Sequence, residues 1–161
     1  MNLHERLLPF LVSTASSAGI GKVIARRRLL TTDAGIEREL GVDGRGIRCC
    51  FVTRTSDAVG DKYEEPDGHE YAATRKPVYE FEIWYGFDDR DESPSETEID
   101  AAYEALVAKF DEQGVRKEMR ETYRALIVEP LAMTERSVSM TPQSYMVSRI
   151  IAAMTIEGEA Q

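Results

Sequence analysis

The sequence predicts a single α+β domain over residues 1–161, with a mainly antiparallel sheet flanked by an N-terminal helix and a central amphipathic helix. Apolar side chains alternate with polar ones along several stretches, as in strands, and recur every three to four residues along others, as in helices. These elements follow in the order helix, strand, short helix, strand, loop, strand, helix, strand, strand. With 161 residues, 42% of them hydrophobic, the chain is long enough to enclose one core.

The N-terminal segment predicts a helix that begins at Asn2, with Glu5 as its capping-box partner. One apolar face recurs at helical spacing: Leu3, Leu7, Phe10 and Leu11. Pro9 lies inside this pattern and is expected to kink the helix or to cut it. Because Glu5 stands where a secretion signal carries basic residues and the apolar run is short, we expect a helix of the domain rather than a leader.

A strand is expected over residues 22–30, and it ends in a basic cluster of Arg26, Arg27 and Arg28. Residues 31–40 can form a short helix, and residues 43–46 turn the chain. A second strand is expected from Ile47 to Thr55.

The two cysteines, Cys49 and Cys50, are neighbours in this second strand. Their side chains therefore point to opposite faces and cannot share a metal ion. Spaced cysteine pairs are absent from the sequence, so a disulfide framework is excluded and a reducing setting is expected, with both thiols buried. Residues 56–76 are polar and rich in turn formers, and we expect a long polar loop there.

The third strand shows the clearest alternation. One face carries Tyr79, Phe81, Ile83, Tyr85 and Phe87, and it is predicted to be the core face. The strand ends in an acidic block, after which Ser93, Pro94 and Glu96 predict the start of the central helix. Its apolar stripe comprises Ile99, Tyr103, Leu106 and Phe110, and Gly114 is expected to end it.

After Gly114, a further helical piece is expected from Val115 to about Leu126, interrupted by Pro130. Two strands then close the chain, over Leu131–Met140 and Ser144–Glu157. On the last strand one face is predicted to carry Met146, Ile150, Ala152, Met154 and Ile156.

Composition and motifs exclude most chemistry. The net charge of −9 repels phosphate backbones and anionic lipids, so DNA gripping and membrane binding are not expected. The longest uncharged run, residues 7–21, is too short to cross a bilayer. His4 and His69 lack ligand partners at metal-binding spacing, and "EEPDGHE" lacks the ligand rhythm of a calcium loop. We therefore predict neither a metal nor a cofactor.

Glu80 and Glu82 are the one carboxylate pair whose spacing is compatible with catalysis. They lie on one strand face roughly 7 Å apart, a spacing that overlaps that of inverting glycosidases. Such pairs are also common on wet strand faces. Phosphate loops, nucleophile elbows and Cys-His motifs are absent from the sequence. We predict that the protein is not an enzyme and has no catalytic residues.

The order of elements resembles that of the tail terminator proteins of long-tailed bacteriophages, the minor tail protein U type. The similarity covers nearly the whole chain: an N-terminal amphipathic helix, a strand, "IRCCFVTRT", a long polar insertion, "VYEFEIWYGFDD", "ESPSETEIDAAYEALVAKF", "ERSVSM" and "SYMVSRIIAAMTIEGE". It lies in pattern and size, since no single motif in it is diagnostic. The short helix at 31–40 and the extra length before Pro130 depart from the pattern.

This resemblance implies a virion protein of the tail or neck, present in the host cytoplasm during assembly. Such proteins form a homo-hexameric ring that caps the tail tube, ends its polymerisation and joins the tail to the head connector. The partners are then the tail tube protein and a head connector or completion protein, and DNA passes through the ring without specific binding. The alternatives are another head-completion protein, or a small dimeric ligand-binding domain or hydrolase that uses Glu80 and Glu82.

Charge suggests where subunits of such a ring meet. Identical acidic subunits repel one another, so interfaces need basic groups. The densest basic segment is Arg26, Arg27 and Arg28. The densest acidic block comprises Asp88, Asp89, Asp91 and Glu92. We predict that these two segments pair across the subunit interface. The alternatives for the arginines are pairing with acids of the same copy, plain exposure to solvent, or contact with DNA phosphates.

Overall fold

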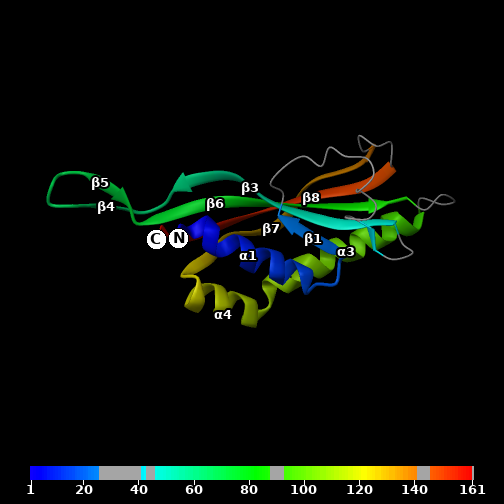
Figure 1. The fold of residues 1–161 in the computed structure, drawn as a ribbon, viewed down its shortest axis with the longest axis horizontal. Helices are drawn as coiled ribbons and strands as arrows, with labels where there is room; N and C mark the ends of the chain where they lie inside the picture. Colours follow the sequence, from blue (N-terminus) through cyan, green and yellow to red (C-terminus); the bar gives the residue numbers. More distant parts are fainter. Residues whose placement is uncertain (26–40, 43–45, 88–92, 141–145, 161) are drawn as a thin grey trace.

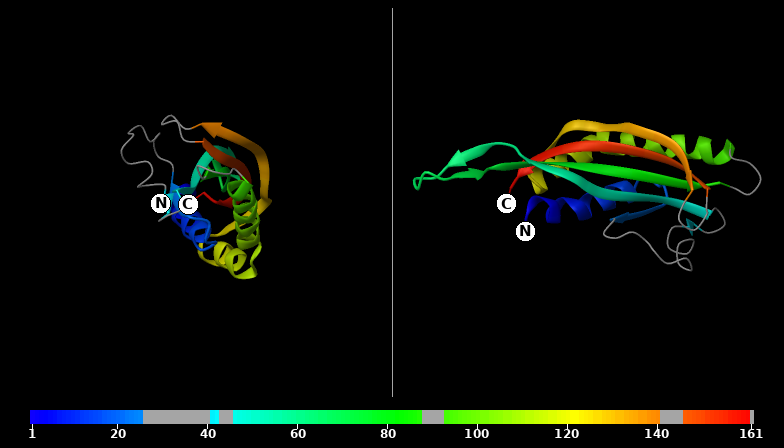
Figure 2. Two further views of the ribbon diagram at one scale, coloured as in Figure 1. Left: turned by 90° about the vertical axis from the view of Figure 1, so that its right-hand side faces the viewer. Right: turned by 90° about the horizontal axis from the view of Figure 1, so that it is seen from above.

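The computed structural model describes residues 1–25, 41–42, 46–87, 93–140 and 146–160. Within these ranges it contains an elongated, mainly antiparallel sheet, and three helices lie along one side of it (Figures 1 and 2). This confirms the predicted α+β class and the mainly antiparallel sheet. Residue 1 and the last described residues lie close together, toward the end of the main sheet from which β4 (Lys62–Glu64) and β5 (Glu70–Ala72) project (Figure 1).

The main sheet has the strand order β1-β3-β6-β8-β7, and β2 pairs with β3 outside this path. Its members are β1 (Lys22–Ala25), β2 (Gly41–Val42), β3 (Gly46–Val59), β6 (Thr74–Gly86), β7 (Ala125–Met140) and β8 (Met146–Glu159). Only β1 runs parallel to its neighbour β3, and the other described pairs are antiparallel. A separate two-stranded sheet consists of β4 (Lys62–Glu64) and β5 (Glu70–Ala72).

The helices are α1 (Leu3–Ser16), α3 (Ser93–Asp111) and α4 (Gln113–Thr122). The predicted capping box of α1 is confirmed: the Asn2 side chain accepts from the Glu5 N–H, and the Glu5 carboxylate accepts from the Asn2 N–H. Of the two outcomes expected for Pro9, the cut is wrong, because α1 continues to Ser16, and the kink stays a prediction. Side chains buried on both sides of the proline, such as Leu7 and Leu11, hold the helix together across it.

The core lies between the helices and one face of the sheet. The predicted face of β6 is confirmed for Tyr79, Phe81, Ile83 and Tyr85, which are buried there. Phe87 follows the end of β6 and is only half-buried, so its place on this face was wrong. They share one cluster with the stripe of α3, and the rings of Phe81 and Phe110 meet edge to face with centroids 5.3 Å apart. Four of the predicted core positions of β8 are confirmed as well: Ile150, Ala152, Met154 and Ile156. The fifth, Met146, is wrong, because it begins the strand and is 38% exposed.

Two predicted boundaries are wrong. Residues 56–76 are not a loop: they extend β3 to Val59, form β4 and β5, and begin β6 at Thr74. The central helix does not end at Gly114. It ends at Asp111, and the extended backbone of Glu112 separates it from α4, which contains Gly114.

The second helical piece is also shorter than expected. It stops at Thr122, and Arg124 then adopts a left-handed conformation with φ of 54°, which is typical of the residue that follows a helix. Residues 126–130 belong to β7 instead. Pro130 is tolerated there because β7 is an edge strand and its pairing with β8 shifts register around this position.

Several predictions fall outside the described residues. These are the basic end of the first strand, the short helix at 31–40, most of the turn at 43–46, and the acidic residues 88–92.

Candidate functional site

One part of the molecule extends away from the core. The arm, residues 59–74, carries β4 and β5 and projects from one end of the sheet (Figure 1). Its pairing continues that of the main sheet, since Val59 pairs with Arg75 at the root and Glu64 pairs with Glu70 near the tip. All side chains from Asp61 to Tyr71 are exposed. The arm is therefore a two-stranded ribbon without a core of its own.

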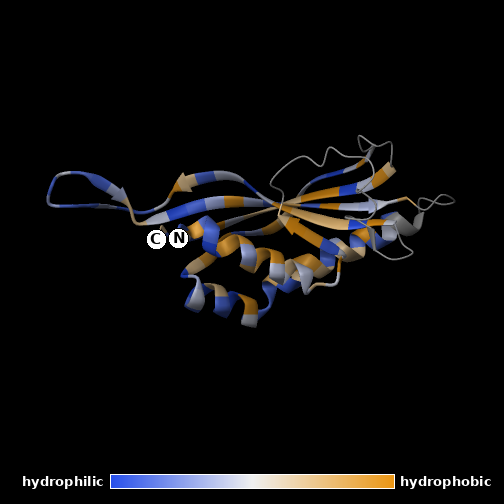
Figure 3. Ribbon diagram, in the orientation of Figure 1, coloured by the Kyte–Doolittle hydropathy of each residue, from blue (hydrophilic) through white to orange (hydrophobic). Residues whose placement is uncertain are grey.

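The tip of the arm has a defined turn. Gly68 adopts φ of 84°, and its N–H donates to the Glu65 carbonyl. The Asp67 carboxylate accepts from the His69 N–H at 2.8 Å and from the Tyr71 hydroxyl at 3.2 Å. These bonds give the ribbon a specified shape, although its surface is largely hydrophilic (Figure 3).

Two tyrosines form the main apolar feature of the arm. Tyr63 and Tyr71 are direct cross-strand partners, and their rings stack with centroids 5.7 Å apart. Their residues are 47% and 42% exposed, so half of this aromatic surface remains in water. Acidic side chains surround the pair: between residues 61 and 70 there are five acids and one lysine. The arm thus presents an aromatic patch in an acidic surround.

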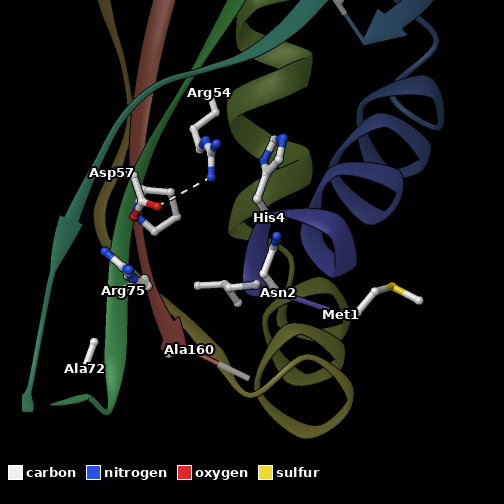
Figure 4. A pocket seen from close by; sticks show the side chains of 10 residues that line it. Met1, Asn2, His4, Arg54, Asp57, Ala72, Arg75 and Ala160 are labelled. Carbon is white, nitrogen blue, oxygen red and sulfur yellow. Dashed lines mark hydrogen bonds and ion pairs between the residues drawn. The ribbon is translucent and has the colours of Figure 1, made fainter.

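A pocket of about 600 Å³ lies at the root of the arm. Its walls come from the start of α1, from β3, from β6 and from the last described residues (Figure 4). Two arginines line it. Arg54 lies 3.4 Å from the Asp57 carboxylate, whereas Arg75 has no ion-pair partner within the described part of the chain. The arginines outnumber the lining carboxylates, so the root pocket is positively charged.

His4 forms one wall of this root pocket and connects it to the core. Its Nδ1 is 2.9 Å from the Tyr79 hydroxyl, and the two rings stack. Partial burial, with a further contribution from the Arg54 charge, lowers the pKa of His4 below its ordinary value, while Asp57 and Glu5 act in the opposite direction. At neutral pH the imidazole is therefore uncharged, and the positive charge of the pocket comes from the arginines.

The face of the sheet opposite the helices carries the candidate carboxylates. Glu82 is only 7% exposed and accepts from Arg149 Nε at 2.5 Å, and Arg149 also lies 3.5 Å from Glu135. Glu80 lies two residues before Glu82 on the same face and is half-buried. The Glu82 carboxylate is thus engaged in an ion pair within the monomer. The lack of catalysis itself stays a prediction.

The remaining predicted sites have simpler outcomes. Cys49 and Cys50 are both buried and free, on opposite faces of the sheet, and burial raises the pKa of the Cys49 thiol to about 12. Among the described residues, no group of three or more His, Cys, Asp or Glu side chains could hold a metal ion. None of the described helices is long and apolar enough to cross a membrane.

The predicted interface residues lie outside the described ranges. Arg26, Arg27 and Arg28 precede the described β2, and the acidic partners Asp88, Asp89, Asp91 and Glu92 fall between β6 and α3. Their pairing across subunits stays a prediction.

Sequence reasoning missed the arm and the root pocket. A signal for the arm was present, since "PDG" at 66–68 is a turn motif and lies between two tyrosines each four residues from Asp67. The pocket has no such local signal, because His4, Arg54 and Arg75 come from distant segments. Comparison with known proteins finds no family model and no curated protein that matches the chain.

Proposed function

We propose that this chain is a structural virion protein of the phage neck or tail, a tail terminator that assembles into a homo-hexameric ring. The ring caps the tail tube, ends its polymerisation and joins the tail to the head connector. The proposal starts from the resemblance in element order and is supported by surfaces that have no role inside the monomer.

The arm is the observation that carries this proposal. An isolated two-stranded hairpin is marginally stable in water, because it buries little apolar surface. A ribbon held outside the core, with an exposed aromatic pair and unpaired backbone edges, is typical of an element that contacts another chain. A heterologous contact repeated from one copy to the next generates a ring when the rotation closes.

The negative charge of the protein favours a channel through which DNA passes and disfavours a surface that binds DNA. The chain carries a net charge of −9, and among the described residues the sheet face opposite the helices bears Glu80, Glu82, Glu135 and Glu157 beside Arg149 and Lys76. A channel lined by such a face would repel phosphates and let DNA pass without specific binding. The partners in this account are the tail tube protein and a head connector or completion protein.

Native mass spectrometry and negative-stain microscopy test this proposal. We expect a species near six times 18.1 kDa and ring-shaped particles, either in solution or on added tail tubes. Polymerising tube protein should stop growing once the ring is added. Rings that bind the connector but leave tube growth unchanged would point to a head-completion protein, and a ligand-dependent dimer that forms no ring would contradict both.

A further inference from the structure

The arm and the root pocket have complementary surfaces. The arm offers Tyr63 and Tyr71 side by side, with the exposed carboxylates of Glu64 and Glu65 next to them at the tip. The root pocket offers a concave surface of about 600 Å³ with Arg54 and Arg75 in its wall. Among the described residues of one copy, Arg75 has no acidic partner and Glu64 and Glu65 have no basic one, and the tip points away from the body (Figure 1).

We propose that the arm of one copy docks into the root pocket of a second copy of this chain. Tyr63 and Tyr71 enter the pocket, and Glu64 and Glu65 lie against Arg54 and Arg75 of the receiving copy. This inference deepens the proposed ring, and it rests on that function for the number of copies but not for the contact itself.

The dimensions of the arm agree with such a contact. From Val59 to the turn the ribbon spans seven to eight residues, which at about 3.3 Å per residue is roughly 25 Å. That reach is comparable with the width of a small domain, so a tip can cross from one copy to its neighbour. Donor and acceptor surfaces differ, so the contact is heterologous and each copy both gives an arm and receives one.

Arg75 is the residue that most favours an acidic occupant. The other charged side chains around the pocket are already engaged: Arg54 pairs with Asp57, and the nearby Lys76 pairs with Glu157 at 3.5 Å. Arg75 alone among these has no acidic partner within the described ranges. A carboxylate delivered by another copy would pair with it, and the aromatic pair would fill the apolar part of the cavity.

Charge reversal tests the contact. The tip variant E64K/E65K and the pocket variant R54E/R75E should each weaken self-association at least about tenfold, and the variant with all four changes should regain it. The control E118K/E121K makes the same change of charge on the exposed face of α4 and should associate like the parent. Sedimentation velocity measures association, and melting curves verify that each variant folds. If R54E/R75E melts lower, R75E alone replaces it.

Mixing gives the sharpest readout. The tip variant retains an intact pocket and the pocket variant retains an intact arm, and the reversed arm of the first also complements the reversed pocket of the second. An equimolar mixture can therefore make the contact in both directions. We expect the mixture to regain association like that of the parent, with the two variants alternating in the assembly. Neither variant alone has an arm and a pocket of complementary charge, so neither should self-associate.

The outcomes separate this inference from the proposed ring. Rings that form equally well from the parent and from both variants would overturn the arm contact and leave the ring function standing. A different result would be a parent that forms only dimers, which each double variant disrupts and the variant with all four substitutions restores. It would support the contact and overturn the ring. A parent that stays monomeric at every concentration and on tail tubes would overturn both.

Discussion

One pair of strands, β3 and β6, runs through two different environments. From Ile47 to Val52, β3 is buried, and its neighbour β6 carries the core side chains Phe81 and Ile83. From Arg54 to Val59 the same strand is exposed and leads into the arm. The pairing with β6 continues across the boundary, with one register shift between Arg54 and Ser56. Backbone geometry is thus shared, and the side-chain environment changes.

The difference separates stability from assembly. Near the helices, apolar burial holds the structure, so substitutions there should change the free energy of unfolding. In the arm the structure rests on backbone hydrogen bonds, a defined turn and one aromatic pair. Substitutions there should change the free energy of unfolding little and change association strongly.

The largest effect is expected in the core. Replacing Phe81 or Phe110 by Ala should lower the free energy of unfolding by ~3–5 kcal/mol, because each ring is buried and the two pack edge to face. Urea denaturation followed by circular dichroism measures this loss. Midpoints equal to that of the parent for both variants would remove Phe81 and Phe110 from the core.

The second largest effect on the free energy of unfolding is expected at Arg48, a buried charge. Arg48 donates to Glu98 at 2.9 Å and to the carbonyls of Ile47 and Gly86, and its side chain is only 9% exposed. Arg48→Ala should cost ~2–3 kcal/mol, because it removes one donor from each of two carbonyls and from the Glu98 carboxylate. Glu98→Ala should cost less, about 1 kcal/mol, since Glu98 is 44% exposed. Equal losses in the two variants would show that the ion pair, and not the carbonyl contacts, decides the effect.

The sequence predicted the part of the fold that is governed by burial. Alternation from Tyr79 to Tyr85 identified the core face because a buried face forces a period of two. The cap at Asn2 was readable because capping is local. The arm could not be predicted in this way, since both of its faces are exposed to solvent and apolar and polar side chains do not alternate along it. The root pocket depends on tertiary contact between α1, β3 and β6, which no local pattern encodes.

A smaller effect on stability is expected in the arm. Tyr63→Ser with Tyr71→Ser should cost at most about 1 kcal/mol, because a cross-strand aromatic pair at the surface contributes little. Self-association of this double variant should nevertheless fall at least about tenfold relative to the parent. A loss of stability as large as that of Phe81→Ala would mean that the arm belongs to the folding core.

The smallest effect concerns pH. Burial lowers the pKa of His4 below its ordinary value of 6.5, so the unfolded chain binds a proton more readily than the folded one. The contribution of His4 to the free energy of unfolding should be complete above pH 6.5, its ordinary pKa. It should be lost as the pH falls below 6.5 toward the lower pKa of the folded state. Melting temperatures of the parent and of His4→Gln should therefore diverge at neutral pH and converge in acid. A difference that is the same at every pH would contradict this assignment.

The most direct test compares the native mass of the parent with that of a variant whose residues 61–73 are replaced by Asn-Gly. The main sheet and the helices lie outside this segment, so the variant should melt close to the parent. We predict a ring near six times 18.1 kDa for the parent, in solution or on tail tubes, and a folded monomer for the variant. Rings of the same mass from the variant, or a parent that never assembles, would contradict the account.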